Sequence, residues 1–307
     1  MRACRRPAAH AALHLIHRTL LSSTHLTNGP SVEEEYFALS GALPAGAALP
    51  GEEDGPFHDW QHVTEILLDA GEFIGYKYFG IPGSLPARLD RYELHLTDPG
   101  AWHADRRTPR LALDLAVRPR RVIGRGTHGL DLDCGVRLDD AVCARISSAL
   151  AFLAPLPRYL PEPARPAAPV RPADVGRSAP GNVLLGTPSL NTYARLSAPV
   201  LIPGGGHGLG ADPGGPVPDL TLVEVARQAA VLCVRLACGL TPERTVVTSL
   251  ALRRRGAAVA GAPMYCTAVP GELSVNDLGQ PGAPVTLTVS QHERTVLEAT
   301  ATVRQEY

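Results

Sequence analysis

A proline-rich segment at residues 154–172, APLPRYLPEPARPAAPVRP, divides this chain of 307 residues nearly in half. Proline fixes φ and lacks the backbone donor, so the segment can form neither a helix nor a central strand. We expect a semi-rigid, extended linker there. The sequence therefore predicts two domains, residues 1–153 and 173–307, joined by residues 154–172.

Each half contains one stretch with the periodicity of a long amphipathic helix. In the first half the apolar series is Val63, Ile66, Leu67, Ala70, Phe73 and Ile74. In the second half it is Leu222, Val225, Ala226, Ala229, Leu232, Cys233 and Leu236. Gly80 and Gly239 stand where glycine commonly ends a helix. We therefore expect one helix in each half, ending near these glycines.

Strand-like segments follow each predicted helix. Apolar and polar residues alternate in RYELHLTD, RLALDLAVRP and GLDLDCGVRLDDAVCARISSALAFL of the first half, and in TVVTSLALRR, MYCTAVPGEL, VTLTVSQ and VLEATATVRQ of the second. This period of two is typical of antiparallel strands with one covered face. The pairs Asp139-Asp140 and Glu293-Arg294 are expected at the tips of two corresponding hairpins.

The shared order of elements indicates an internal repeat of about 150 residues. One helix packed against a curling antiparallel sheet is an α+β arrangement. A helix wrapped by such a sheet is the hotdog architecture. We expect a double hotdog, with two tandem hotdog repeats that each wrap an antiparallel sheet around a long central helix.

Composition narrows the function classes. Apolar residues make up 45% of the chain and charged residues 19%, which is enough apolar mass for a core. A formal net charge of −1 argues against a protein that binds nucleic acid by neutralising phosphates. No apolar run approaches the length of about 18 residues that would suggest a membrane span.

The six cysteines are irregularly spaced and form no CxxC pair. In a chain of this length they are typical of free, mostly buried thiols in a reducing compartment, which favours the cytoplasm. The stretch MRACRRPAAHAALHLIHRTLL superficially resembles a signal peptide. Histidines and Arg18 interrupt its apolar part, and a clean small-residue cleavage site is missing, so we expect no secretion.

The second predicted helix carries the most informative motif. Val217-Pro218 precedes it, and Glu224-Val-Ala-Arg227-Gln228-Ala lies inside it. This pattern is similar to the central helix of hotdog β-hydroxyacyl-ACP dehydratases. It resembles still more closely the A-factor synthases, the γ-butyrolactone signal synthases of actinobacteria, whose helix reads VPG-apolar-apolar-E-A-A-R-Q-A.

Other segments support the second resemblance. Residues 171–185 resemble the opening of the family's second repeat, and Ile16-His17-Arg18 that of its first. The stretch from His58-Asp59 to Glu65 is similar to the family's D-P-L-L-x-x-E. The likeness touches both halves and is more specific in the second.

The chain also departs from the family pattern. The family turn D-H-V-P-G is Gly215-Pro-Val-Pro-Asp219 here and lacks the histidine, for which His207 is a candidate substitute. The first-repeat helix has Leu68-Asp69 where the family has arginine and glutamine. These changes point to degeneracy of one of two pseudo-symmetric sites.

Glu224 is the first catalytic candidate, because a carboxylate inside an apolar helix is costly to bury. Arg227 and Gln228 lie three and four positions further and reach the same helix face. The functional interpretation is a general base or a substrate anchor, with Arg227 and Gln228 binding substrate. The structural alternative is an Arg–Glu pair at the interface of the repeats.

Four residues of the first half are further candidates. Glu65 and Asp69 place two carboxylates on one helix face, which suits proton transfer and equally suits a solvated face. His58 and Asp59 precede the helix. Hotdog dimers share their active site between units, so His58 is expected to face Glu224. The structural alternative is a helix cap formed by Asp59.

The glycine-rich loop at residues 203–215 holds His207 and could bring backbone N–H groups to a phosphate. A flexible surface loop is the alternative interpretation. The arginines at 120, 121, 125 and 253–255 are candidate contacts for a phosphate or an acidic carrier protein, or else solvated strand ends. No metal-ligand spacing and no nucleophile motif stands out, although Cys233 on the second helix stays open as a nucleophile.

The resemblance implies an acyltransferase that moves a β-ketoacyl group from acyl carrier protein to dihydroxyacetone phosphate. An intramolecular condensation then gives a butenolide, the precursor of a γ-butyrolactone-like signal of secondary metabolism. The implied partners are acyl carrier protein or another acyl thioester and a small phosphorylated acceptor, with no cofactor. Two alternatives stay open: another hotdog acyl-thioester enzyme (dehydratase or thioesterase), and a catalytically silent double hotdog that binds an acyl ligand or a protein.

Overall fold

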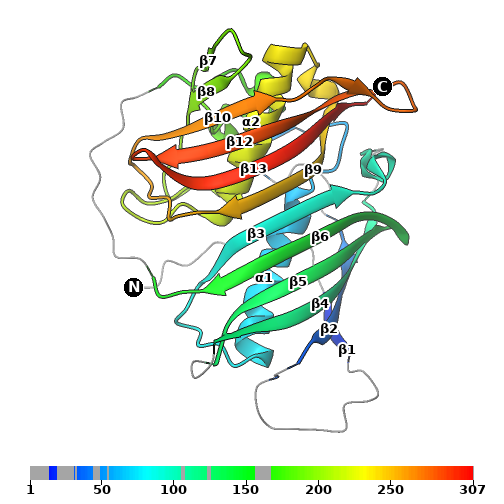
Figure 1. The fold of residues 1–307 in the computed structure, drawn as a ribbon. Helices are drawn as coiled ribbons and strands as arrows, with labels where there is room; N and C mark the ends of the chain where they lie inside the picture. Colours follow the sequence, from blue (N-terminus) through cyan, green and yellow to red (C-terminus); the bar gives the residue numbers. More distant parts are fainter. Residues whose placement is uncertain are drawn as a thin grey trace.

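The computed structural model describes residues 14–18, 31, 33–43, 49–53, 55–104, 108–122, 126–155 and 167–306. In this part of the chain, thirteen antiparallel strands form one continuous sheet, and two long helices lie on one of its faces (Figure 1). Helices that cover one face of an antiparallel sheet form the expected α+β arrangement.

The first half contributes one long helix and six strands. The helix is α1 (Gln61–Tyr78). The strands are β1 (His14–Arg18), β2 (Glu35–Ala42), β3 (Ala87–Leu96), β4 (Arg110–Val122), β5 (Gly126–Leu138) and β6 (Ala141–Phe152). A 3₁₀ turn, η1 (Pro99–Trp102), follows β3. The sequence analysis found α1 and β3 to β6, and it missed β1 and β2.

The second half contributes one long helix and seven strands. The helix is α2 (Asp219–Cys238). The strands are β7 (Ser189–Leu190), β8 (Leu196–Pro199), β9 (Thr245–Arg254), β10 (Met264–Pro270), β11 (Ser274–Val275), β12 (Pro281–Gln291) and β13 (Arg294–Gln305). Three 3₁₀ turns complete it: η2 (Pro172–Val175), η3 (Pro180–Asn182) and η4 (Pro242–Arg244).

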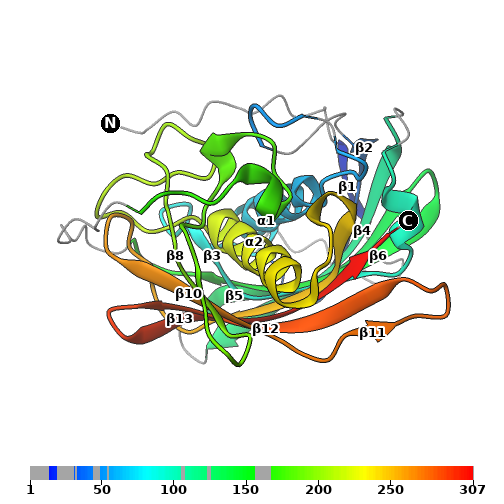
Figure 2. The same ribbon diagram turned by 90° about the horizontal axis from the view of Figure 1, so that it is seen from above.

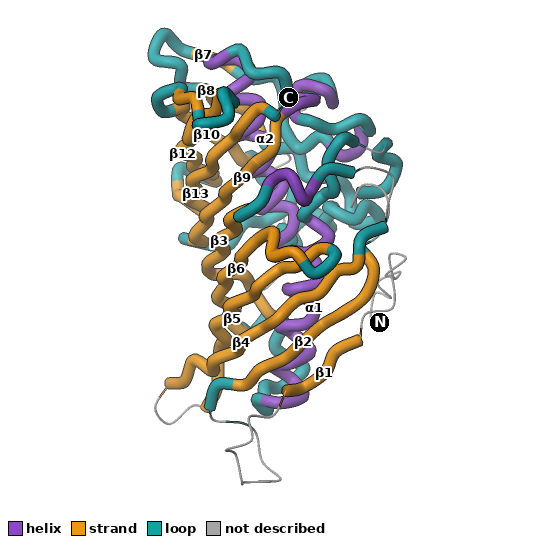
Figure 3. Tube along the Cα trace, turned by 90° about the vertical axis from the view of Figure 1, so that its right-hand side faces the viewer, coloured by secondary structure: helices purple, strands orange, loops and turns teal. Residues whose placement is uncertain are grey.

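The order of strands in the sheet is nearly symmetric about its centre. It runs β1-β2-β4-β5-β6-β3 and continues β9-β13-β12-β10-β8-β7, with β11 beside β12. The two halves therefore join where β3 pairs with β9, from Arg91 opposite Arg253 to His95 opposite Ser249. The sheet curves around both helices (Figure 2), and the loops of the second half cover the side of α2 that faces away from the sheet (Figure 3).

The two helices differ in how far they are covered. Every residue of α2 from Thr221 to Val234 is buried, because the sheet lies on one side and loops on the other. Helix α1 keeps an exposed stripe, and Phe73, expected in its apolar face, is 48% exposed. Leu236 is also exposed near the end of α2. The expected glycine stops are confirmed, since Gly239 adopts positive φ directly after α2 and Gly80 does so directly after Phe79, the C-cap of α1.

Two tight hairpins close the long strand pairs. Asp139 and Asp140 both have positive φ between β5 and β6, as a two-residue turn requires. The expected turn Glu293-Arg294 is wrong by one residue, because His292 and Glu293 have positive φ and Arg294 already begins β13. A bulge between Val289 and Ser290 shifts the register that leads into this turn.

Most of the expected linker, residues 156–166, lies outside the described residues. Of the described part, Pro169 forms an isolated bridge with Gly186, and η2 begins at Pro172. Within the described ranges, no helix is both long enough and apolar enough to cross a membrane.

Candidate functional site

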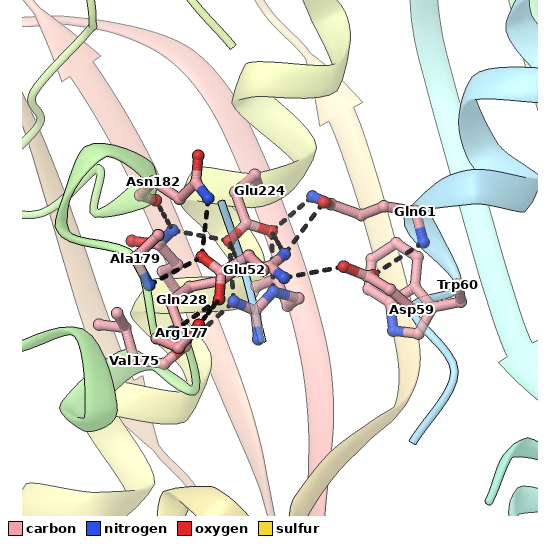
Figure 4. A network of polar contacts seen from close by, with 12 residues as sticks. Glu52, Asp59, Trp60, Gln61, Val175, Arg177, Ala179, Asn182, Glu224 and Gln228 are labelled. Carbon is pink, nitrogen blue, oxygen red and sulfur yellow. Dashed lines mark hydrogen bonds and ion pairs between the residues drawn. The ribbon is translucent and has the colours of Figure 1, made fainter. Parts of the chain in front are cut away.

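Glu224 lies in the second turn of α2 and is fully buried. Its carboxylate accepts hydrogen bonds from four side chains, those of Gln61, Arg177, Arg227 and Gln228. Figure 4 shows this network from close by. The donors are Nε and Nη2 of Arg177 at 2.8 and 2.9 Å, Nε and Nη2 of Arg227 at 2.7 and 2.8 Å, Nε2 of Gln61 at 2.5 Å and Nε2 of Gln228 at 2.6 Å. Each oxygen accepts three of these bonds, so the acceptor capacity of the carboxylate is filled.

Arg177 links the starts of both helices. The chain leaves η2 through Gly176, which adopts a left-handed conformation and directs Arg177 toward α2. Its guanidinium binds Glu224 through two nitrogens, Asp59 Oδ2 at 2.8 Å and Gln61 Oε1 at 3.0 Å. A planar guanidinium fork can hold two acceptors in this way, which a lysine could not. One side chain therefore joins an element of each half.

The electrostatics of this cluster favour the ionised forms of Glu224, Asp59 and Arg177. Burial alone would raise the pKa of Glu224, but Arg177 and Arg227 outweigh it and lower that pKa to about 2. The pKa of Asp59 is also lowered, because the same two arginines outweigh its burial. The pKa of Arg177 is raised, since Glu224 and Asp59 oppose the cost of burying a cation. A carboxylate this acidic and this fully bonded is a weak proton acceptor near neutral pH.

Arg227 and Gln228 have their polar groups directed into the protein. Arg227 Nη2 also donates to the carbonyl oxygen of Val175 at 3.0 Å. Gln228 Oε1 accepts from the backbone N–H of Leu184 at 2.8 Å, and its Nε2 donates to the carbonyl oxygen of Asn182 at 2.7 Å. These bonds fix the segment that follows η2 against α2. Substrate binding by Arg227 and Gln228 stays a prediction.

The four candidates of the first half occupy different environments. Asp59 Oδ1 accepts from the backbone N–H of Gln61, but the N-cap residue of α1 is Trp60 and has no side-chain cap, so Asp59 lies one residue before the position expected of a cap. His58 is buried, and its backbone N–H donates to the carbonyl oxygen of Trp102. On α1, Glu65 is partly buried and Asp69 is exposed. The structure brings Asp59 into the cluster around Glu224, while catalysis by His58 and Glu65 and substrate binding by Asp69 stay predictions.

The glycine-rich loop is shaped by its own contacts. A Cβ on Gly210 would lie 1.9 Å from the carbonyl oxygen of Gly204, and one on Gly205 would lie 2.2 Å from Asp212 Oδ1. Gly210 is therefore required for the loop to close on itself, because the backbone carbonyl of Gly204 cannot move aside as a side chain can. His207 is partly buried, and its Nδ1 accepts from the N–H of Leu209, so in the neutral ring Nε2 carries the proton.

The structure also bears on whether a cysteine could act as a nucleophile and whether side chains could hold a metal ion. The cysteines at 134, 143, 233, 238 and 266 are free, as expected, and all but Cys238 are buried. Burial raises the pKa of Cys233 to about 12, which makes it a poor nucleophile. In the described ranges, no group of three or more histidine, cysteine or acidic side chains could hold a metal ion.

Comparison with known proteins agrees with this geometry. The family model of the A-factor biosynthesis hotdog domain matches residues 160–305. Residues 160–305 belong to this hotdog family. The matched range, residues 160–305, includes Arg177, Glu224, Arg227 and Gln228, which form the larger part of the buried cluster around Glu224. No curated protein sequence matches the chain.

Solved structures of thioesterases resemble the fold of most of this chain. A protein from Lactobacillus plantarum described as an oleoyl thioesterase is 10% identical, with a TM-score of 0.53 and coverage of 89% of this chain and 97% of that chain. The 12:0-ACP thioesterase from Umbellularia californica is 13% identical, with a TM-score of 0.52 and coverage of 88% and 94%. A protein from Novosphingobium aromaticivorans described as a thioesterase is 14% identical, with a TM-score of 0.51 and coverage of 89% and 96%. At these identities the likeness is one of fold.

The sequence analysis did not identify several residues of the cluster around Glu224 as site residues. Arg177 lies in the stretch that resembles the family's second repeat, and that stretch was its only signal. Gln61 has no such signal in the sequence, because glutamine at the start of a helix is common. Glu52 was also missed; it accepts from the N–H of Ser178 at 2.6 Å and from Asn182 Nδ2 at 2.7 Å, beside the cluster (Figure 4). These partners are set by loop packing between halves, which spacing in the sequence does not encode.

Proposed function

We propose that the protein is an enzyme that acts on acyl thioesters and transfers the acyl group as A-factor synthases do. The observation that carries the proposal is the meeting of Glu224, Arg227 and Gln228 with Gln61 and Arg177. The first three belong to the helix motif that resembles the family, and the cluster lies where both helices begin. Membership of residues 160–305 in the A-factor biosynthesis hotdog family supports the same reaction class.

The proposal includes a tandem double hotdog. Residues 1–153 would form the first repeat, residues 154–172 the linker and residues 173–307 the second repeat. The near-symmetric strand order about the β3–β9 pair supports this division. Coverage of both halves by single thioesterase structures supports it as well.

In this proposal Glu224 is a positioning residue. Its filled carboxylate orients Arg177 and Arg227 and leaves no lone pair for a substrate proton. The acyl carbonyl would be polarised by N–H groups in the first turn of α2. That turn has no side-chain cap, because its N-cap residue is Pro218, and the carboxylate of Asp219 binds Arg254 and the N–H of Leu89.

Proton transfer from the acceptor hydroxyl is assigned to His58, which directly precedes Asp59 of the cluster. His207 would donate from Nε2 to an oxygen of the acceptor, since its Nδ1 is already an acceptor. Glu65 and Asp69 would serve an equivalent site on α1. Leu68 and Asp69 stand where the family has arginine and glutamine, so we assign the principal site to the second half.

The proposed donor is a β-ketoacyl group on acyl carrier protein, and the proposed acceptor is dihydroxyacetone phosphate. The 12:0-ACP thioesterase of the same fold supports an acyl group carried in this form. The product would be a phosphorylated ester that condenses to a butenolide. We place this reaction in the cytoplasm and in secondary metabolism.

The test is to incubate the protein with a β-ketoacyl thioester and dihydroxyacetone phosphate and to identify products by mass spectrometry. A phosphorylated ester or butenolide supports the proposal. Free acid or enoyl product would establish a thioesterase or dehydratase instead. Tight binding of the thioester without turnover would establish the silent alternative, which the filled carboxylate of Glu224 also favours.

A second measurement separates positioning from proton transfer. Glu224→Gln is expected to raise KM and lower kcat without removing an ionisation from the pH profile of kcat. Glu243→Gln, an exposed glutamate in η4, is the matched control and should leave both constants unchanged. Loss of the acidic limb of that profile, the fall in kcat at low pH, in Glu224→Gln would contradict the positioning role, because a carboxylate base must be ionised to act.

A further inference from the structure

Residues 49–53 of the first half, which we call the strap, lie against the second half. The N–H of Glu52 donates to the carbonyl oxygen of Leu49 at 3.4 Å, and Gly51 between them has positive φ. Proline at the second position and glycine at the third are typical of a type II turn, which residues 49–52 therefore form. Leu49 is buried, whereas Glu52 is partly exposed. The turn is thus anchored by Leu49 and presents Glu52 to the second half.

Hydrogen bonds between the halves hold the carboxylate of Glu52 (Figure 4). One oxygen accepts from the N–H and the hydroxyl group of Ser178, at 2.6 and 2.8 Å. The other accepts from the N–H of Ala179 at 3.3 Å and from Nδ2 of Asn182 at 2.7 Å. Ser178 Oγ in turn accepts from the N–H of Glu53 at 2.7 Å. We call these bonds the latch, and they join segments that lie 125 to 130 positions apart in the chain.

Asn182 lies under the strap and is fully buried. Its Nδ2 donates to Glu52 and also to the carbonyl oxygen of Pro50, at 3.0 Å. Its Oδ1 is buried and accepts from no donor in the described part of the chain. A buried acceptor without a donor is costly, so it raises the free energy of the closed arrangement. Opening of the strap releases this amide, which can then turn and give its oxygen a donor.

The strap also touches the glycine-rich loop that holds His207. A Cβ on Gly208 would lie 3.8 Å from Cδ of Pro50. A Cβ on Gly181, in the segment that carries the latch donors, would lie 3.8 Å from Nε2 of His207. The strap, the latch and His207 therefore meet in one place, and the strap lies over the side of the loop from which His207 could be reached.

We propose that the strap is a lid over the proposed site, closed by the latch, which opens to admit the acyl acceptor to His207 and excludes water when it is closed. The latch consists of polar contacts at the surface, since Ser178 is exposed and Glu52 partly so, and such contacts open at low cost. A closed lid keeps water from competing with the acceptor for the acyl group. What the lid admits rests on the proposed function, whereas the opening of the strap and the shielding of His207 do not.

Hydrogen exchange of the full chain, measured residue by residue by NMR, tests the latch. The N–H groups of Ser178 and Ala179 bond to Glu52, so they should exchange at least tenfold faster in Glu52→Ala. Glu53→Ala is the matched control and should leave them unchanged, because Glu53 joins the latch through its backbone. Unchanged exchange of both groups in Glu52→Ala would overturn the latch.

A second variant and an internal reference support this measurement. Ser178→Ala removes the hydroxyl group and should speed exchange at the N–H of Glu53 at least fivefold. The N–H of Leu184 bonds to Gln228 Oε1 inside the second half and should exchange at the same rate in every variant, which shows that the fold is retained. Unchanged exchange at Glu53 in Ser178→Ala would also contradict the latch.

Chemical labelling of His207 tests the lid without any turnover. Diethyl pyrocarbonate modifies accessible histidines, and peptide mass spectrometry locates the modified residue. His207 should be labelled at least fivefold faster in Glu52→Ala than in the wild type, and at the wild-type rate in Glu53→Ala. Equal rates in the wild type and Glu52→Ala would overturn a lid over His207, even if the latch is shown to open.

The ratio of hydrolysed to transferred acyl group tests what the closed lid does. With a β-ketoacyl thioester and dihydroxyacetone phosphate, Glu52→Ala should release at least fivefold more free acid per ester formed than the wild type. An unchanged ratio would overturn the exclusion of water. Absence of any product would instead count against the proposed function, while hydrogen exchange and labelling of His207 would still decide on the latch and the lid.

Discussion

Arg177 and Glu224 are 47 positions apart in the sequence and form a buried two-point ion pair, with Nε–Oε1 at 2.8 Å and Nη2–Oε2 at 2.9 Å. The pair joins the segment after η2 to the second turn of α2. Through Asp59 and Gln61 it also holds the start of α1. The cluster therefore fixes how the two halves meet at their helix starts.

Glu224→Ala is expected to destabilise the protein by about 3–5 kcal/mol, because it leaves two buried guanidinium groups without their shared anion. Chemical denaturation monitored by circular dichroism measures the change in the free energy of unfolding. Glu243→Ala on the exposed η4 turn is the control and should change it by less than about 0.5 kcal/mol. A loss below about 1 kcal/mol in Glu224→Ala would show that the buried pair is not a structural link.

Stability should fall in acid over the range set by Glu224. Its pKa is lowered to about 2 from a usual value of 4.5, so its contribution is complete above about pH 4.5 and is lost as the pH falls toward 2. This lowering of the Glu224 pKa corresponds to about 3 kcal/mol in the free energy of unfolding. Urea unfolding at several pH values in this range, for the wild type and Glu224→Gln, measures it. The gap between the two proteins should narrow as the pH falls, and a constant gap would contradict the prediction.

Gly210→Ala is expected to destabilise the protein by about 1–3 kcal/mol, because the added Cβ would meet the carbonyl oxygen of Gly204 at 1.9 Å. Gly206→Ala is the matched control in the same loop, since nothing lies within 4 Å of its Cβ. Limited proteolysis and thermal unfolding compare the two variants. Equal behaviour of both would mean that the loop is not closed as the structure has it.

Buried thiols should resist alkylation in the native protein. Burial raises the pKa of Cys233 and of Cys266 to about 12, so almost no thiolate forms at pH 8. Iodoacetamide followed by peptide mass spectrometry should leave both residues unmodified until the protein is denatured. The partly exposed Cys238 is an internal comparison and should react first. Rapid native labelling of Cys233 would reopen it as a nucleophile.

Much of the local structure could be predicted from the sequence. The helices α1 and α2, their glycine stops and the long strands β3 to β6 follow from periodicity and turn residues, which act over a few positions. The strands at the two ends of the sheet, β1 and β2 at one end and β8 and β7 at the other, were not predicted, since pairing with their neighbours defines them. For the site, Glu224 and Arg227 were identified because they share one turn of helix. Arg177 and Gln61 were not, because their contacts form between distant segments.

The sequence by itself determined the two-part order of elements, the hotdog resemblance and the polar face of α2 that carries Glu224. Local spacing is enough for these, because neighbours on one helix or strand have fixed geometry. Only the tertiary structure decided that Glu224 is enclosed by Arg177, Arg227, Gln61 and Gln228. It also decided that Phe73 is exposed while α2 is covered on all sides. Burial depends on which loop lies over a helix, and that arrangement follows from contacts between segments far apart in the chain.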